Sequence, residues 1–317
     1  MLKAFKSQDD GTLTELSIES IEKGSWISLI APTADELQTV QRLTNVEANF
    51  LRAALDEEER SHTDVEETGI LVLTNVPILR ESDVYDTLPL GTVITHDYFI
   101  TVCLEGNAVL NEFGRDTQKL FRTFKKTRFL FQILYKSATY YLKYLRQISH
   151  KSEQIEDRLR ESMRNEEILR LLELSKGLTY FNAAIRSDGA VLDKLLRLRS
   201  NLTVAPMLKM YEEDEDLLED VIIENKQARE MAEMYSAILS RMADTFSSII
   251  SNNQNSVMKF LAAVTIILAI PTVISSFFGM NVDIPFATQN NAFLTVAFIS
   301  AAMAGAASYI LWRHNMF

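Results

Sequence analysis

One face of a long helical pattern near the C-terminus carries residues that could line a path for ions. Polar or small residues, with Met258 as the exception, recur there at alternating gaps of four and three positions. We call this set the polar stripe; it comprises Asp244, Ser248, Ser251, Asn255, Met258, Ala262, Thr265, Ala269, Thr272 and Ser276. Such spacing places the side chains on one side of an α-helix.

The polar stripe has two interpretations at this stage. Small residues such as Ala262 and Ala269 permit close packing of helices in a membrane. Asp244 and Asn255 instead favour a water-filled cavity, because polar groups at membrane depth usually face one. A pore would need several copies of the chain around one axis, because two helices cannot enclose a channel.

A short motif follows the polar stripe. Gly279, Met280 and Asn281 come directly after an apolar run, and a glycine at this place lets another backbone approach closely. The amide oxygen of an asparagine can hold a hydrated cation through its water shell. This suits magnesium, which gives up its water reluctantly. The tripeptide alone is also compatible with a plain loop turn.

Acidic residues gather in two places outside the stripe. One cluster is Asp56–Glu59, and the other runs from Glu212 to Asp216 and continues at Glu219 and Asp220. Charged runs of this kind usually form a solvated surface. The alternative is divalent-ion sensing, in which carboxylates that face each other between subunits repel until a cation such as Mg²⁺ neutralises them.

Two uncharged stretches would place the second half of the stripe in a membrane and the motif just outside it. Phe260–Phe278 and Ala292–Trp312 are each long enough to cross a hydrocarbon core of about 30 Å as helices, which disfavours a buried helical hairpin. Residues 1–10 contain no apolar signal core. Because Lys259 and Arg313 flank the two spans, we expect a multi-pass protein of the cell (plasma) membrane with both termini in the cytoplasm.

The rest of the pattern predicts an α+β cytoplasmic domain, a long stalk helix and two C-terminal transmembrane helices. Strand signals precede about residue 105, and residues from about Asp116 to Arg199 follow a helical pattern in which Gly177 and Gly189 mark candidate bends or a turn. The predicted strands are Trp26–Ile30, Gly69–Thr74, Thr92–Thr95 and Tyr98–Leu104, and a capped helix is predicted to start within Pro32–Leu37.

The predicted stalk helix is the longest element. Residues 206–278 would extend roughly 110 Å as one helix, so it must leave the cytoplasmic domain and become the first membrane span. The predicted segments are an α/β domain at 1–110, a long-helix region at 111–205, the stalk helix and first span at 206–278, an extracytoplasmic loop at 279–291, a second span at 292–312 and a cytoplasmic tail at 313–317.

Composition excludes several functional classes. The net charge of −11 leaves no basic excess for nucleic-acid binding. A single cysteine, Cys103, excludes a disulfide framework, and the four histidines lack metal-ligand spacing. No Gly-rich phosphate loop that ends in Lys-Ser or Lys-Thr is present. We therefore expect that the protein is not an enzyme and binds no cofactor. Its expected partners are the lipid bilayer and divalent cations.

The motif in its position resembles the signature of the CorA family of magnesium transport channels. Gly279-Met280-Asn281 lies at the outer end of the penultimate hydrophobic segment, and Asn255–Leu261 and Pro271 are also similar to that family. Trp26–Leu29 resembles the family's first strand. The sequence departs from the family pattern at Phe278, where a tyrosine is frequent, and at Val282, where a phenylalanine is usual.

The resemblance implies a funnel-shaped homopentamer with a pore along the stalk helix. Asn281 would form the outer filter ring, and Asn255 a polar lining position. Met258 with Leu261 would form the hydrophobic gate, and Asp244 an acidic ring at the cytoplasmic mouth. Regulatory metal sites would lie between the N-terminal domain and the stalk, where Asp220 matches the stalk position and Asp56 its partner.

The expected function is passive, membrane-potential-driven magnesium uptake gated by cytoplasmic divalent ions, with cobalt and nickel as further ions. The metal-contacting residues would be Asn281, Asp244, Asp220 and Asp56, and Mg²⁺ would be both cargo and regulator. Alternatives within the same class are a zinc transporter of the related branch and divalent efflux. A membrane-anchored scaffold is the alternative from another class; it would not require the polar stripe.

Overall fold

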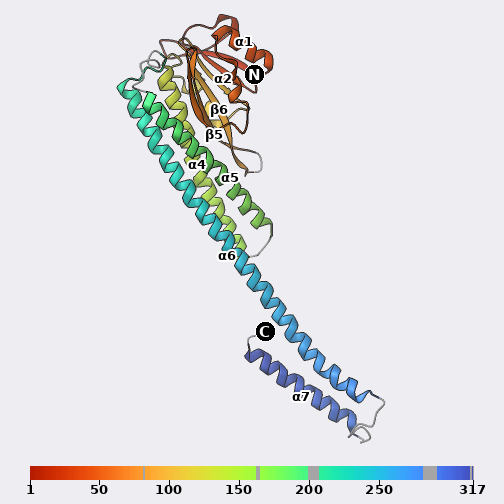
Figure 1. Ribbon diagram of the computed structural model, residues 1–317. Helices are drawn as coiled ribbons and strands as arrows, with labels where there is room; N and C mark the ends of the chain where they lie inside the picture. Colours follow the sequence, from red (N-terminus) through yellow and green to blue (C-terminus); the bar gives the residue numbers. More distant parts are fainter. Residues whose placement is uncertain (81–82, 162–164, 199–206, 281–290, 315, 317) are drawn as a thin grey trace. The chain divides into compact units, whose positions relative to one another are not determined.

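A seven-stranded mixed sheet forms from the apolar runs in the first part of the chain (Figure 1). The computed structural model describes residues 1–80, 83–161, 165–198, 207–280, 291–314 and 316. These residues form two compact units, Met1–Arg241 and Met242–Phe317. The predicted α+β domain, long helix and C-terminal helix are thus confirmed as elements of the fold.

The strands lie in the order β2-β1-β3-β7-β6-β5-β4, and all neighbours are antiparallel except β3 and β7. Their bounds are β1 Leu2–Ser7, β2 Leu13–Leu16, β3 Trp26–Ile30, β4 His62–Glu66, β5 Gly69–Leu79, β6 Tyr85–Ile94 and β7 Phe99–Cys103. The parallel strands β3 and β7 need a long crossover connection. Two short helices and the strands β4, β5 and β6 lie between them in the chain and provide it.

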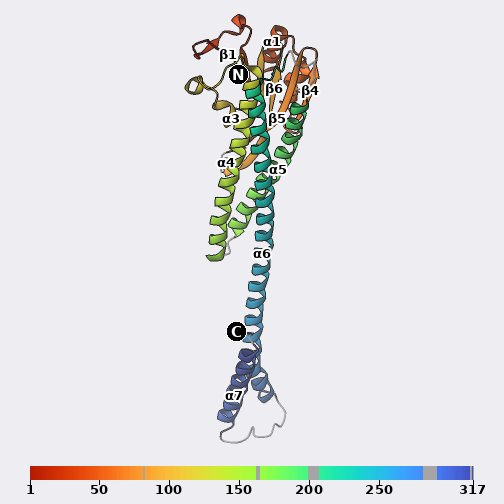
Figure 2. The ribbon, with the colours of Figure 1, turned by 90° about the vertical axis from the view of Figure 1, so that its left-hand side faces the viewer.

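Both faces of the sheet are buried, because consecutive residues of a strand point to opposite sides. In β5, Ile70 and Val72 join a core with helices α4 (Lys126–Glu161) and α5 (Asn165–Leu198). Leu71 and Leu73 join the other core, with helices α1 (Ala34–Thr44) and α2 (Ala48–Ala53). Figures 1 and 2 show the sheet between these two groups of helices.

The longest helix, α6 (Glu212–Phe278), belongs to both units. In the N-terminal unit its Leu218 and Val221 are buried in the same core as α4 and α5. The side-chain amide of Asn182 on α5 donates to the Ser236 hydroxyl of α6 at 2.8 Å. The other elements are α3 Ala108–Asn111, α7 Ala292–Arg313 and short 3₁₀ turns at Ile18–Ser20 and Arg115–Thr117.

Several local predictions are confirmed. Helix α1 begins with a reciprocal cap, in which the Thr33 hydroxyl accepts from the Glu36 amide at 3.3 Å and the Glu36 carboxylate accepts from the Thr33 amide at 2.9 Å. Strand β3 has the predicted bounds, and the hairpin around His96 and Asp97 joins β6 to β7. Cys103 is fully buried in β7, where burial raises the pKa of its thiol to about 12.

Other predictions were wrong. Trp26–Leu29 lies in the third strand, because Leu2–Ser7 and Leu13–Leu16 form a hairpin at the edge of the sheet. The predicted helical region from Asp116 begins only at Lys126. The stalk helix begins at Glu212 instead of residue 206, since the acidic residues that follow favour a helix N-terminus.

The glycines predicted to bend the helical region lie inside α5. A Cβ atom on Gly177 would stand 2.8 Å from Cβ and 3.0 Å from the carbonyl oxygen of Tyr85. Gly177 therefore permits α5 to approach β6 closely, which explains a glycine at a helix-interior position. A Cβ atom on Gly189 would lie 3.3 Å from the side-chain oxygen of Asn225 on α6, so this glycine serves the packing of α5 against α6.

One buried carboxylate ties α5 to the sheet. Strand β4 ends its pairing at His62 opposite Leu73, so the Asn75 amide of β5 has no β4 partner. Asp188 of α5 accepts from that amide at 2.9 Å and from the Ser61 hydroxyl at 2.7 Å. Tyr141 of α4 donates to the Asn75 carbonyl at 2.9 Å. Burial raises the pKa of Asp188 to about 7, although both hydrogen bonds oppose this shift.

Asp188 should make the stability of the protein depend on pH. Its pKa rises from 3.8 to about 7 on folding, so the folded state holds a proton that the unfolded state releases between these values. Stability therefore falls as pH rises through this window, by an amount on the order of 4 kcal/mol. In Asp188→Asn the side-chain oxygen can still accept both hydrogen bonds, so we expect this component to disappear.

The measurement is the free energy of unfolding of the full-length protein in detergent between pH 4.5 and 8. Asp193→Asn is the matched control, because Asp193 is an exposed carboxylate on the same helix. It should leave the pH profile unchanged. Parallel profiles for wild type and Asp188→Asn would contradict the assignment.

Candidate ion pathway

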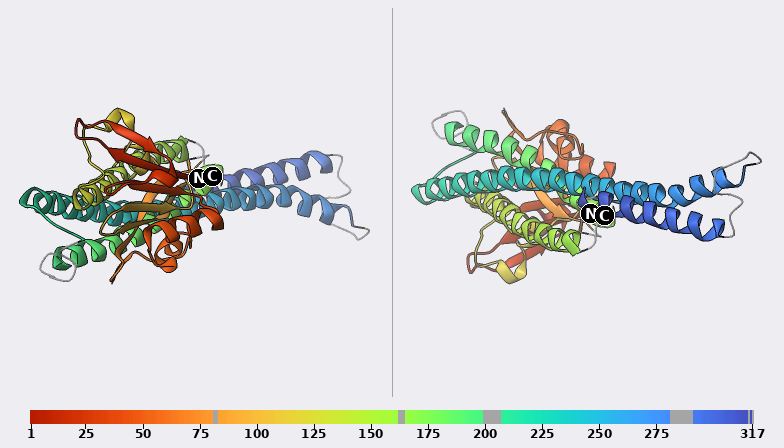
Figure 3. Two further views of the ribbon diagram at one scale, coloured as in Figure 1. Left: turned by 90° about the horizontal axis from the view of Figure 1, so that it is seen from above. Right: turned by 90° about the horizontal axis from the view of Figure 1, so that it is seen from below.

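The C-terminal unit contains α6 from Met242 to Phe278 and the antiparallel helix α7. Both helices are long and apolar enough to cross a membrane. The views in Figures 1, 2 and 3 agree that α7 runs beside the end of α6. Helix α7 ends at Arg313, close to the predicted 312. The unit therefore has the two helices that the uncharged stretches predict.

The covered residues of each helix lie on one face. On α6 the least exposed positions of the last turns are apolar, and they include Ala263, Ile267, Ile270 and Ile274, at gaps of three and four. On α7 they include small residues at similar gaps; they are Val296, Ser300, Ala304, Ala307 and Leu311. Ala263 is fully buried. We infer that these two faces pack together, with the small residues of α7 permitting close approach.

The polar stripe lies on another face of α6. At about 100° per residue, the direction of the stripe from Ala262 to Ser276 lies roughly 150° from that of the covered positions. Every residue of the polar stripe is exposed in the structure, as is Leu261. Packing of α6 against α7 therefore does not account for the small and polar residues of the stripe. The side chains of the stripe are therefore left to contact another molecule or water.

Three of the five hydroxyl groups of the stripe donate to carbonyls of the helix itself. Ser248 donates to the Asp244 carbonyl at 3.0 Å, Thr265 to the Leu261 carbonyl at 2.8 Å, and Thr272 to the Leu268 carbonyl at 3.0 Å. Such bonds allow Ser and Thr to sit in a membrane helix without unsatisfied donors. Their hydroxyl oxygens still present lone pairs outward, which a hydrated cation can use.

Asp244 is the charged residue of the stripe, and it forms no ion pair with the residues that the structure describes. Asp244 is exposed, and Asn255 lies exposed three turns further along the helix. Met258 and Leu261 are 58% and 56% exposed, which leaves two large apolar side chains next to the polar ones. Along this face of α6 an acidic side chain is thus followed by an amide and then by two exposed apolar side chains.

The C-terminal end of the stripe borders the sequence motif. Helix α6 continues through Pro271 and ends at Phe278, and the Gly279 amide donates to the Ser275 carbonyl at 2.9 Å. Thr272, Ser276 and Met280 border a shallow cavity of about 260 Å³. Gly279 and Met280 are both exposed. Asn281, the predicted filter residue, lies outside the described residues.

The predicted regulatory residues lie on separate elements of the N-terminal unit. Asp56 is exposed just after α2, and Asp220 is exposed near the start of α6. Among the described residues, no three or more His, Cys, Asp or Glu side chains gather in a way that could hold a metal ion.

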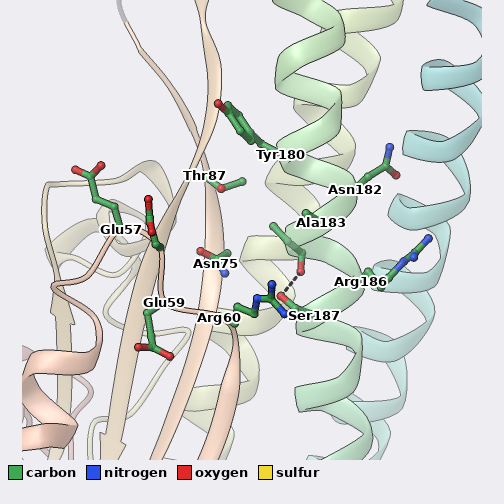
Figure 4. A pocket seen from close by; sticks show the side chains of 12 residues that line it. Glu57, Glu59, Arg60, Asn75, Thr87, Tyr180, Asn182, Ala183, Arg186 and Ser187 are labelled. Atoms are coloured by element: carbon green, nitrogen blue, oxygen red, sulfur yellow. Dashed lines mark hydrogen bonds between the residues drawn. The ribbon is translucent and has the colours of Figure 1, made fainter. Parts of the chain in front are cut away.

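The acidic residues after Asp56 border a cavity on α5. Figure 4 shows Glu57 and Glu59 on one side of it and Tyr180 and Arg186 on the other. The cavity has a volume of about 750 Å³. Beneath it, the Ser187 hydroxyl donates to the Ser61 hydroxyl at 2.8 Å, and Ser61 donates to Asp188.

The sequence patterns did not identify the network of Ser61, Asn75 and Asp188. Its only signal is a carboxylate on a face of α5 that otherwise carries apolar residues, such as Leu192 and Leu195. This signal is visible only when the buried face of α5 is already known, and the partners of Asp188 lie on distant strands.

Comparisons with known proteins give a consistent result. The family model described as CorA-like Mg²⁺ transporter protein matches residues 22–313. The cobalt/magnesium transport protein CorA of Methanocaldococcus jannaschii is 26% identical, with 99% of each chain covered.

Solved structures also share the fold. The complete structure of the CorA magnesium transporter from M. jannaschii superposes with a TM-score of 0.81 at 24% identity, covering 98% of this chain and 96% of the other. The cytoplasmic domain of ZntB from Vibrio parahaemolyticus gives a TM-score of 0.60 at 13% identity, covering 80% of this chain and 97% of the other.

The face assignment makes a prediction about water access in liposomes. Cysteine at Ala262 should react with a charged, membrane-impermeant thiol reagent, because the stripe is polar and uncovered. Cysteine at Ala263 should not react, because that position is fully buried. Cysteine at Leu268, which is 66% exposed, should also stay unreacted if its apolar face meets lipid. The only native cysteine, Cys103, is buried and gives a low background.

Labelling is measured by the mass shift of the intact protein. Reaction at Leu268→Cys together with protection at Ala262→Cys would reverse the assignment of the faces.

Proposed function

The chain belongs to the CorA family of Mg²⁺ transporter proteins, and we propose that it is a passive channel for magnesium uptake, gated by divalent ions in the cytoplasm. The observation that carries this proposal is the polar stripe, exposed along α6 on a face that the packing with α7 leaves free. Several copies of the stripe around one axis would line a path for cations. We propose a homopentamer, with both termini in the cytoplasm and α6 and α7 crossing the cell membrane.

The proposed pathway uses different chemistry at each level. Asn281 provides a ring of amide oxygens at the outer end, which holds the ion through its water shell. Met258 and Leu261, both exposed on α6, narrow the path with apolar side chains and gate it by excluding water. Asn255 and Asp244 then present oxygen atoms towards the cytoplasm. Five chains of net charge −11 give the cytoplasmic side a field that attracts cations.

The membrane potential suffices to drive uptake. A divalent cation that moves into a compartment negative by about 100 mV gains about 4.6 kcal/mol, which is twice the value for a single charge. Transport then requires no coupled hydrolysis.

Gating is proposed to depend on carboxylates of neighbouring subunits. Asp56 and Asp220 are exposed, so they are free to meet residues of another copy. When cytoplasmic magnesium is high, Mg²⁺ between such carboxylates removes their repulsion and holds the subunits in a closed arrangement. When magnesium is low, the repulsion returns and the subunits separate. Because α6 contains both Asp220 and the stripe in one helix, this movement can reach the pore.

Two alternatives remain within the same architecture. Zinc transport is the alternative that the family's related branch implies, and the cytoplasmic fold does not discriminate against it. Efflux is open because a pore carries ions in either direction according to the gradient. Flux of Mg²⁺ and Zn²⁺ into liposomes, with and without a pH gradient and with the membrane potential set in both directions, separates these alternatives from potential-driven magnesium uptake.

Removal of the proposed filter should abolish transport. In Asn281→Ala the ring of amide oxygens is lost, so we expect magnesium flux into liposomes to fall to the level of protein-free liposomes. Asn291→Ala is the matched control, since Asn291 precedes α7 without a side-chain cap and should conduct normally. Undiminished flux in Asn281→Ala would refute the filter assignment.

Removal of the proposed regulatory carboxylate should leave the pore intact but unregulated. In Asp220→Ala we expect normal flux at low internal magnesium and loss of inhibition as magnesium on the cytoplasmic side is raised. Asp216→Ala changes an exposed aspartate in the first turns of the same helix and should retain inhibition. Equal inhibition curves for wild type and Asp220→Ala would exclude Asp220 from gating.

A further inference from the structure

Among the residues that the structure describes, three carboxylates are buried, namely those of Glu167, Asp188 and Asp214. Glu167 pairs with Arg170 at 3.3 Å. The carboxylate of Asp214 lies 3.6 Å from the Arg128 guanidinium. Asp188 forms no ion pair within the described part of the chain, although a buried charge is costly unless it is paired. Asp188 therefore avoids this cost only when it holds a proton.

No charged group compensates Asp188. The strands β5 and β6 contribute the uncharged Asn75 and Thr87 to the cavity above it. The charged and titratable groups on the elements around it are Glu57, Glu58, Glu59 and Arg60 in the loop before β4, His62 on β4, Tyr141 on α4, Arg186 and Lys194 on α5, and Glu233 on α6 (Figure 4). Lys194 donates to the Thr63 carbonyl. Arg186 pairs with Glu233 at 3.6 Å. Burial raises the pKa of Asp188 to about 7, and only its hydrogen bonds oppose this shift.

Ser61 joins Asp188 to the acidic loop. The Ser61 hydroxyl donates to Asp188 at 2.7 Å. The same hydroxyl accepts from the side-chain amide of Asn75 at 2.9 Å and from the Ser187 hydroxyl at 2.8 Å. Ser61 directly follows the segment Asp56–Arg60. The hydrogen bonds of Ser61 therefore hold the end of this loop on α5.

Ionisation of Asp188 weakens this hold. The ionised carboxylate is buried with two hydrogen bonds and no counter-charge, which disfavours the charged form. An arrangement in which Ser61 withdraws and water reaches the carboxylate then becomes more stable by comparison. Lys194 still donates to the Thr63 carbonyl of β4, so the movement is confined to Ser61 and the loop before it.

We propose that Asp188 is a proton-binding regulatory site. With its proton bound, it fixes the loop Asp56–Arg60 on α5 and strengthens inhibition by cytoplasmic magnesium; on ionisation it releases the loop and weakens that inhibition. This inference rests on the proposed function, in which Asp56 is a regulatory carboxylate. Acidification of the cytoplasm then favours the closed channel.

The direction and size of the effect follow from linkage. When the loop is held, Asp188 keeps its proton up to a pKa of about 7, whereas a hydrated carboxylate keeps it only to its ordinary value of 3.8. The hold on the loop is therefore strongest at low pH and weakens as pH rises through this window. Between pH 6 and pH 8 the equilibrium constant for the held loop should fall about tenfold.

The first test is magnesium flux into liposomes with equal pH on both sides, at pH 6 and at pH 8. In wild type, the cytoplasmic magnesium concentration that halves the flux should rise by up to about tenfold from pH 6 to pH 8. Asp188→Asn can accept both hydrogen bonds without a charge, so it should show the wild-type pH 6 value at both pH values.

Two control variants should retain the wild-type shift. Asp193→Asn changes an exposed carboxylate on the same helix. His62→Gln removes the histidine next to Ser61, since histidine is the residue type that usually titrates near neutral pH. Loss of the shift in His62→Gln and its persistence in Asp188→Asn would assign the proton to the wrong residue and overturn the inference.

Amide hydrogen exchange gives a second readout that needs no transport. After correction for the intrinsic effect of pH on exchange, protection of the peptide that contains Asn75 should fall from pH 6 to pH 8 in wild type and stay constant in Asp188→Asn. The inference is overturned if inhibition or protection is independent of pH in wild type, or if Asp188→Asn shifts as wild type does. PH-dependent protection without any magnesium-inhibited flux would locate the failure in the proposed function instead.

Discussion

One unbroken helix has to present different chemistry to different neighbours, and the rest of the structure depends on how its faces are divided. At its beginning, α6 buries Leu218 and Val221 in the core of the sheet unit. Towards its end, it buries Ala263 on the face that packs with α7. The polar stripe uses the directions that remain. A helix in hydrocarbon satisfies its own backbone hydrogen bonds. The side chains of this third face can therefore serve function instead of stability.

Much of this arrangement could be predicted from the sequence, since it rests on local signals. The absence of charge between Phe260 and Phe278 predicts a membrane helix, and the alternating gaps of the polar stripe predict its face. The cap at Thr33 was predictable because both of its hydrogen bonds join residues three positions apart. Predictions of this kind succeed because the physical cause lies within a few residues of its effect.

Features that depend on distant contacts could not be predicted. Gly177 resembles a helix breaker until Tyr85 of β6 is seen beside it. Asp188 resembles a surface carboxylate until the end of β4 leaves the Asn75 amide without a partner. The start of α6 was placed too early because the acidic residues from Glu212 onward fix its N-terminus more strongly than Pro206 does. For the candidate site, the stripe was predictable, whereas any site shared between copies needs the assembly itself.

The fold does not choose between magnesium and zinc as the proposed cargo, so that choice depends on ligand chemistry. Zinc is bound in proteins mainly through histidine nitrogen and cysteine sulfur, whereas magnesium takes oxygen ligands and keeps most of its water. From Asp244 to Asn291 the sequence contains no histidine and no cysteine, and apart from Lys259 its polar side chains are hydroxyls, amides and carboxylates. A pathway of such groups handles an ion through its hydration shell. In the proposed pathway, the stripe would therefore favour the ion that retains that shell most strongly, which is magnesium.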